Sequence, residues 1–196
     1  MAEYPARGAE AVSPDPARPT LGSTQPAPPG TGAAAPGFTL RNQHGESVEL
    51  AAAAGAPVLL MFYPFAFSRV CGSELREVHR RWAEFQRTGA SVLAISCDAV
   101  HTLRAYADEL VNSLEAAGRG SDQTGVSQTD GGPQLLSDFW PHGAAAQQYG
   151  VLNPHTGAPQ RVSFLLDGGL RVQHQIASQN NEARSVDQTL QLLRTL

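Results

Sequence analysis

The chain has 196 residues, of which 41% are hydrophobic, so it is long enough for one domain with a full core and too short to suggest two. The formal net charge is -4 and the sequence has no basic run, so it lacks the clustered positive charge of proteins that bind nucleic acid or anionic membranes. Two cysteines are too few for a secreted disulfide framework, and neither a signal peptide nor a long apolar run is visible, so we expect a soluble cytoplasmic protein.

The first 34 residues are rich in proline, alanine and glycine. They hold seven of the 14 prolines and almost no aliphatic side chains. A segment that buries so little apolar surface cannot offset its conformational entropy. We therefore predict a disordered tail over residues 1–34 and one folded domain over residues 35–196.

The domain is predicted to open with a β-hairpin over residues 35–50. Two short apolar segments, Phe38–Leu40 and Val48–Leu50, flank the turn signal Asn42–Gly45.

A short apolar run, Val58–Tyr63, is followed by a loop and then by apolar residues at helical spacing from Leu75 to Phe85. The run predicts a buried strand, and the later segment predicts an amphipathic helix. Cys71 then lies where the loop enters the first turn of the helix. Unpaired backbone N–H groups and the helix dipole favour an anion at that position, so Cys71 is a candidate thiolate nucleophile.

The neighbours of Cys71 fit this interpretation. The hydroxyl of Ser68, three residues earlier, is within reach of the sulfur or of an oxygen of a bound substrate, and Pro64 offers a pocket wall without an N–H donor. The alternative is structural, because a single cysteine beside an apolar strand is often only a small buried hydrophobic residue.

The next segment repeats the order of strand and helix. Val92–Ser96 predicts a second buried strand, and apolar residues at helical spacing from Val100 to Leu110 predict a second helix. This order implies parallel strands joined by a crossover. Cys97 falls at the end of the second strand, on the sheet edge where the active sites of open α/β sheets gather.

The C-terminal part contains a loop, a hairpin and a helix. Residues 118–133 are polar and glycine-rich and predict a surface loop. We interpret it as a loop without a role in catalysis rather than as a lid over the active site. Residues 162–166 and 170–176 predict a second hairpin, and residues 186–193 a terminal helix. The whole pattern predicts an α/β fold with a central mixed sheet flanked by helices.

The spacing Pro64-x-x-x-Ser68-x-x-Cys71-x-x-Glu74 resembles the peroxidatic-cysteine signature of the peroxiredoxins, the AhpC/TSA family. The resemblance covers residues 34–196 and continues in chain order at Ala35–Leu40, Leu93–Ser96, Leu135–Asp138 and Arg161–Asp167. Two further segments resemble the one-cysteine, AhpE-type branch of actinobacteria, namely Phe62–Phe67 and Asp138–Gly143. The sequence departs from the family pattern at two positions: Gly37 stands where the family usually has Asp, and Ser68 replaces the commoner Thr. Neither change removes the chemistry.

The resemblance implies a thioredoxin-like fold and a thiol-dependent peroxidase that reduces hydrogen peroxide and organic hydroperoxides through a sulfenic acid. It implies that Cys71 is the peroxidatic nucleophile, that Arg161 is the catalytic arginine and that Ser68 and Pro64 complete the site. Glu74 would either orient Arg161 or only complement the helix dipole. No metal or organic cofactor is implied.

The resemblance implies that an external thiol recycles the sulfenic acid, preferably mycothiol with a mycoredoxin, or else a thioredoxin-like protein. The alternative is that Cys97 acts as a resolving cysteine rather than as a packed thiol. The family also implies a homodimer. A thiol-disulfide oxidoreductase is disfavoured because no second cysteine completes a C-x-x-C pair after Cys71, whereas a redox-regulated binding or chaperone module of the same fold is the other alternative.

Overall fold

The computed structural model describes residues 25–116, 131–179 and 181–196. The strands in this part of the chain are β1 (Thr39–Asn42), β2 (Ser47–Glu49), β3 (Val58–Phe62), β4 (Ser91–Ser96), β5 (Gln134–Ser137), β6 (Leu152–Asn153), β7 (Ala158–Pro159), β8 (Val162–Leu166) and β9 (Val172–Ala177). The helices are α1 (Arg69–Arg80), α2 (Trp82–Arg87), α3 (Val100–Ala116), α4 (Ala144–Gln148) and α5 (Val186–Leu193), with the short 3-10 helix η1 (Leu50–Ala53).

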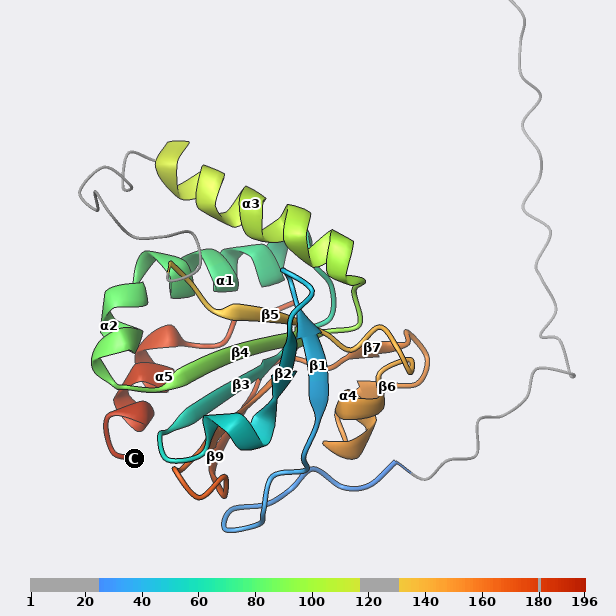
Figure 1. Ribbon diagram of the computed structural model, residues 1–196, viewed down its shortest axis with the longest axis vertical. Helices are drawn as coiled ribbons and strands as arrows, with labels where there is room; N and C mark the ends of the chain where they lie inside the picture. Colours follow the sequence, from blue (N-terminus) through green and yellow to red (C-terminus); the bar gives the residue numbers. More distant parts are fainter. Residues whose placement is uncertain (1–24, 117–130, 180) are drawn as a thin grey trace, which may run out of the picture.

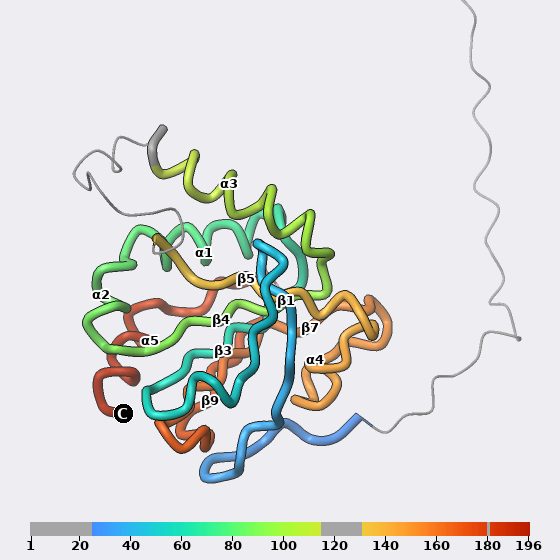
Figure 2. Tube along the Cα trace, viewed as in Figure 1, coloured from blue at the N-terminus to red at the C-terminus, as the bar shows by residue number. Residues whose placement is uncertain are grey.

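Helices cover both faces of a mixed seven-stranded sheet (Figure 1, Figure 2). The strand order is β2-β1-β5-β4-β3-β8-β9, and β6 and β7 form a separate two-stranded sheet. One face of the large sheet packs against α1, α2, α3 and α5, and the other face packs against α4 and η1. The predicted α/β, thioredoxin-like architecture is confirmed.

The central strand β3 is buried along its whole length. Leu59 and Met61 contribute to the core under α1 and α3, whereas Leu60 and Phe62 contribute to the core under α4. A strand that is covered on both faces needs apolar side chains at every position, which explains the continuous apolar run in the sequence.

The sheet topology brings several chain segments to one edge. β3, β4 and β5 are parallel, so the residues that follow each of them emerge at the same side of the sheet. β8 is antiparallel to β3 with Phe62 opposite Val162, so Arg161, which precedes β8, reaches that same edge. The predicted crossover connections are confirmed, as are both hairpins, β1 with β2 and β8 with β9.

One predicted helix is in fact two. The segment from Leu75 to Phe85 is interrupted at Arg81, whose φ of -105° and ψ of 20° lie outside the helical range. At this junction Arg81 pairs with Glu84 of α2 and with Asp187 of α5, which the spacing of apolar residues does not reveal. The sequence also failed to predict α4, β6 and β7, because elements this short carry no periodic pattern.

The predicted tail and loop lie mainly outside the described residues, which omit 1–24 and 117–130. Within the described part of the tail, the Gly32 N–H donates to the Val172 carbonyl oxygen at 2.7 Å, and Ala34 forms a β-bridge with Arg171. The folded domain therefore begins slightly before the predicted boundary at residue 35. Across the described segments, no helix has the length and apolar character that crossing a bilayer requires.

Candidate active site

Cys71 lies in the first turn of α1, immediately after the loop that leaves β3. Ser68 caps this helix, because its Oγ accepts a hydrogen bond of 3.4 Å from the Cys71 backbone N–H and its backbone oxygen accepts one of 2.8 Å from Gly72. The first turn of α1 contains no acidic side chain to offset the positive end of the helix dipole. Cys71 therefore has the predicted place in the fold.

Arg161 brings a positive charge directly to the sulfur. Its Nη2 donates a hydrogen bond of 3.3 Å to the Cys71 Sγ, although 90 residues separate the two in sequence. Cys71 is fully buried and Arg161 is 1% exposed, so solvent screens this contact little. The pairing of β8 with β3 produces the contact, because it places the start of β8 beside the loop that leads to Cys71.

Glu74 holds this arginine in position. Its Oε2 accepts a hydrogen bond of 2.8 Å from Arg161 Nη1 and another of 2.8 Å from Arg184 Nη2. The other oxygen of Glu74 accepts from the backbone N–H and the Nε of Arg184, each at 2.8 Å. Glu74 therefore joins two guanidinium groups that come from distant parts of the chain.

Burial alone would raise the pKa of the Glu74 carboxyl. The hydrogen bonds and charge of Arg184, together with the charge of Arg161, outweigh burial and hold that pKa below its ordinary value. Arg184 is itself buried and also donates to Ser163 Oγ at 2.9 Å. No sequence pattern predicted Arg184, because it lies outside the cysteine motif and 110 residues from Glu74.

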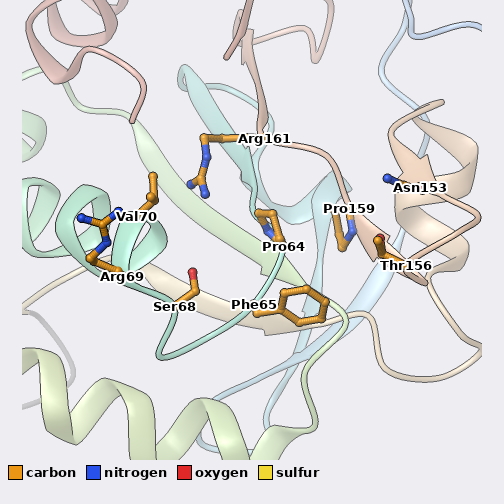
Figure 3. A pocket seen from close by; sticks show the side chains of 9 residues that line it. All are labelled: Pro64, Phe65, Ser68, Arg69, Val70, Asn153, Thr156, Pro159 and Arg161. Atoms are coloured by element: carbon orange, nitrogen blue, oxygen red, sulfur yellow. The ribbon is translucent and has the colours of Figure 1, made fainter. Parts of the chain in front are cut away.

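A pocket of about 260 Å³ opens beside this cluster (Figure 3). One part of its wall is the loop and first turn before Cys71, with Pro64, Phe65, Ser68, Arg69 and Val70. The rest is the β6–β7 hairpin, with Asn153, Thr156 and Pro159, and the side chain of Arg161.

The predicted residues Pro64, Ser68 and Arg161 thus meet at one pocket, next to Cys71. Cys71 is fully buried and does not line the pocket, so side chains of the wall separate its sulfur from the open space. Within the described segments, no group of three histidine, cysteine or acidic side chains is placed to hold a metal ion.

Asp98 fixes the loop before Cys71 to the end of β4. Its Oδ2 accepts hydrogen bonds of 2.8 Å from the Ala66 backbone N–H and of 2.8 Å from Ser96 Oγ. Its backbone oxygen accepts another from Ser137 Oγ at 2.6 Å. Asp98 therefore ties together the segments that follow β3 and β4 and the end of β5, a role that no sequence pattern predicted.

Cys97 lies in a different environment from Cys71. It follows β4 and is half-buried. Its Sγ packs against Gly143 so closely that a Cβ atom built on this glycine would lie 3.2 Å from the sulfur. Burial, and then the charges of Asp138 and Asp98, raise the pKa of the Cys97 thiol to about 12. Both cysteines are free thiols.

Exposed aromatic side chains flank the site on two neighbouring loops. Phe65 and Phe67, in the loop before Cys71, are 48% and 55% exposed. Phe139 and Trp140, in the segment after β5, are 52% and 71% exposed. Asp98 binds the first loop at Ala66 and the end of β5 at Ser137, so these aromatic residues lie on neighbouring segments.

The chain is similar to known peroxidases in sequence. The sequence pattern of the AhpC/TSA family matches residues 31–175. Alkyl hydroperoxide reductase E of Mycobacterium tuberculosis is 38% identical over 137 residues, which are 69% of this chain and 77% of that protein. A putative peroxiredoxin of Bacillus subtilis is 30% identical, over 70% of this chain and 69% of its own.

Solved structures show the same likeness. The peroxidoxin BcpB from Mycobacterium tuberculosis has a TM-score of 0.64 and 28% identity, covering 85% of this chain and 97% of its own. The reduced 2-Cys peroxiredoxin of Plasmodium vivax has a TM-score of 0.66 and 25% identity, covering 83% of this chain and 79% of its own.

We predict that Glu74→Gln lowers the free energy of unfolding by about 3–5 kcal/mol at neutral pH, because two buried guanidinium groups lose their counter-charge. The folded-state pKa of Glu74 is lowered from 4.5, so its stabilising effect is fully present above pH 4.5 and is lost as pH falls through the lower folded value. The difference from wild type should therefore narrow in acid. Urea unfolding at several pH values measures it.

Glu77→Gln is the matched control, because Glu77 lies on the same helix and pairs with Arg80 at the surface. We expect it to cost less than about 1 kcal/mol. Equal effects of the two substitutions would contradict the role assigned to Glu74.

Proposed function

This chain belongs to the AhpC/TSA family and is therefore a peroxiredoxin, a thiol-dependent peroxidase, and we propose that Cys71 alone carries its chemistry. The observation that supports this most directly is the hydrogen bond of 3.3 Å from Arg161 Nη2 to the Cys71 Sγ. A guanidinium keeps its charge throughout the physiological pH range, so the contact favours the thiolate, which is the nucleophilic form of cysteine.

The proposed first step is an in-line displacement on a hydroperoxide, R–O–O–H. The Cys71 thiolate attacks the terminal oxygen, so an S–O bond forms as the O–O bond breaks. The alkoxide R–O⁻ leaves and takes a proton from water to become an alcohol; hydrogen peroxide yields water in the same way. The sulfur is oxidised by two electrons to a sulfenic acid, and the peroxide is reduced by the same two electrons.

The neighbouring groups have distinct proposed roles in that step. Arg161 stabilises the negative charge as it moves from the sulfur to the leaving oxygen, and Glu74 keeps its guanidinium in place. The Ser68 Oγ accepts the Cys71 N–H through a lone pair, so its own O–H can donate to the peroxide. Pro64 lines the pocket without a competing donor and shields the sulfenic acid.

We propose that the peroxide reaches Cys71 from the pocket. Pro64, Ser68 and Arg161 form its wall, while the sulfur behind them is fully buried. The loop before α1 must therefore shift to admit the substrate. About half of the Phe65 side chain is exposed, and Phe67 is also exposed although its ring lies 4.9 Å from that of Tyr106, so this loop is only partly packed against the core.

We propose that an external thiol recycles the sulfenic acid. One thiol attacks the oxidised sulfur, forming a mixed disulfide and releasing water, and a second thiol then frees Cys71 and leaves as a disulfide. Cys97 is a poor resolving nucleophile, because its raised pKa of about 12 keeps it protonated near neutral pH. The similarity to a mycobacterial alkyl hydroperoxide reductase E favours mycothiol with a mycoredoxin as the reductant.

The exposed aromatic residues on the two loops beside the site support a homodimer. Four large rings, Phe65, Phe67, Phe139 and Trp140, are each about half exposed or more on neighbouring segments. Clustered aromatic side chains are typical of protein interfaces, and a second copy of the chain is the proposed partner.

We place the enzyme in the cytoplasm, where thiols stay reduced.

We predict that Cys71→Ser abolishes peroxide consumption in a stopped-flow assay, because the only proposed nucleophile is removed. Cys97→Ser, a matched change at the other free thiol, should keep a rate within about twofold of wild type. Retention of the peroxidase rate by Cys71→Ser would overturn the proposed mechanism.

Mass spectrometry after one equivalent of peroxide tests the recycling proposal. We expect a sulfenic acid on Cys71, which an added thiol converts to a mixed disulfide. An intramolecular Cys71 to Cys97 disulfide would instead assign Cys97 as the resolving cysteine.

A further inference from the structure

The pocket beside Cys71 has basic, polar and apolar side chains in its wall but no acidic one. Figure 3 shows Arg69 and Val70 at one end and Asn153 and Thr156 at the other, with Arg161 reaching in between them. Both charged residues of this wall are therefore arginines.

Arg69 differs from the other arginine of the pocket in being exposed. In the described residues, no ion pair or side-chain hydrogen bond is formed by Arg69, whereas Arg161 is bound to Glu74 and Cys71. Its guanidinium is thus available to a ligand at the mouth of the pocket. Five N–H donors in a planar fork suit the binding of a carboxylate.

The balance of charge around the pocket also singles out Arg69. In the proposed thiolate state, Cys71 and Glu74 carry two negative charges, and Arg161 and Arg184 carry two positive charges. These four groups cancel one another. The charge of Arg69 is left uncompensated by the cluster, so the pocket attracts an anion.

We propose that Arg69 selects hydroperoxides that carry an anionic group, so that the preferred substrate is an organic hydroperoxide with a carboxylate. This inference rests on the proposed function, because it concerns the same pocket. The peroxide end lies toward Arg161, the carbon chain packs against apolar surface such as Val70 and Pro159, and the carboxylate binds the Arg69 guanidinium.

An exposed ion pair contributes little free energy and a charge-assisted hydrogen bond contributes more, so we expect a selectivity of roughly threefold to tenfold. The measured quantity is the ratio of kcat/KM for two probes. One is a branched alkyl hydroperoxide that ends in a carboxylate, and the other is the methyl ester of the same compound. The ratio cancels any effect of Arg69 that is common to all peroxides.

We expect wild type to prefer the acid by roughly threefold to tenfold, and Arg69→Gln to bring the ratio to about one. Arg69→Lys should retain part of the preference. Arg87→Gln, the matched control, removes an exposed arginine at the far end of α2 and should leave the ratio unchanged. In wild type, added salt should lower the ratio, because an exposed charge is screened.

A wild-type ratio near one, or an Arg69→Gln variant with the wild-type ratio, would overturn the inference. So would a loss of rate by Arg69→Gln that is equal for the acid and the ester, because Arg69 would then act on the sulfur. Failure of the proposed function itself has a different signature: the wild-type protein would consume neither probe and would not consume uncharged hydrogen peroxide.

Discussion

The buried pairing of one carboxylate with two guanidinium groups is the constraint on which the site depends. Charged groups are costly to remove from water and persist in a core only when they are well paired. Glu74 accepts hydrogen bonds of 2.8 Å from both Arg161 and Arg184, and all three residues are at most 6% exposed. Its bond to Glu74 leaves the Arg161 side chain little freedom to move. The position of Arg161 Nη2 beside the Cys71 Sγ therefore depends on contacts between distant segments of the domain.

The sheet register determines which residues can join the cluster. β8 pairs with β3 so that Arg161 lies beside the loop that leads to Cys71, and Arg184 comes from the segment just before α5. Asp98 adds a second restraint, because it binds that loop at Ala66 and the end of β5 at Ser137. The loop before Cys71 is thus held near its middle, at Ala66, while the side chains of Phe65 and Phe67 on either side remain about half exposed.

The sequence predicted the parts of the fold that carry a local pattern. The continuous apolar run of β3 and the spacing around Cys71 were enough to predict the strand, the helix and the position of the thiol, and the family resemblance pointed to Arg161. Arg184 could not be found in this way, because its partner is 110 residues distant and no local pattern surrounds it. The break at Arg81 and the short elements β6, β7 and α4 were missed since they depend on tertiary contacts rather than on periodicity. The full burial of Cys71 likewise reflects how the loop, α1 and β8 pack together.

The most direct test of the central claim is the rate at which hydrogen peroxide oxidises Cys71 when Arg161 is replaced. In a Cys97→Ser background that leaves one thiol, Arg161→Gln should slow sulfenic acid formation by at least about 100-fold in single-turnover stopped flow. Arg161→Lys, which keeps a charge to pair with Glu74, should lie between that variant and wild type, and circular dichroism should show that both variants are folded. An oxidation rate within about twofold of wild type in a folded Arg161→Gln protein would contradict the account.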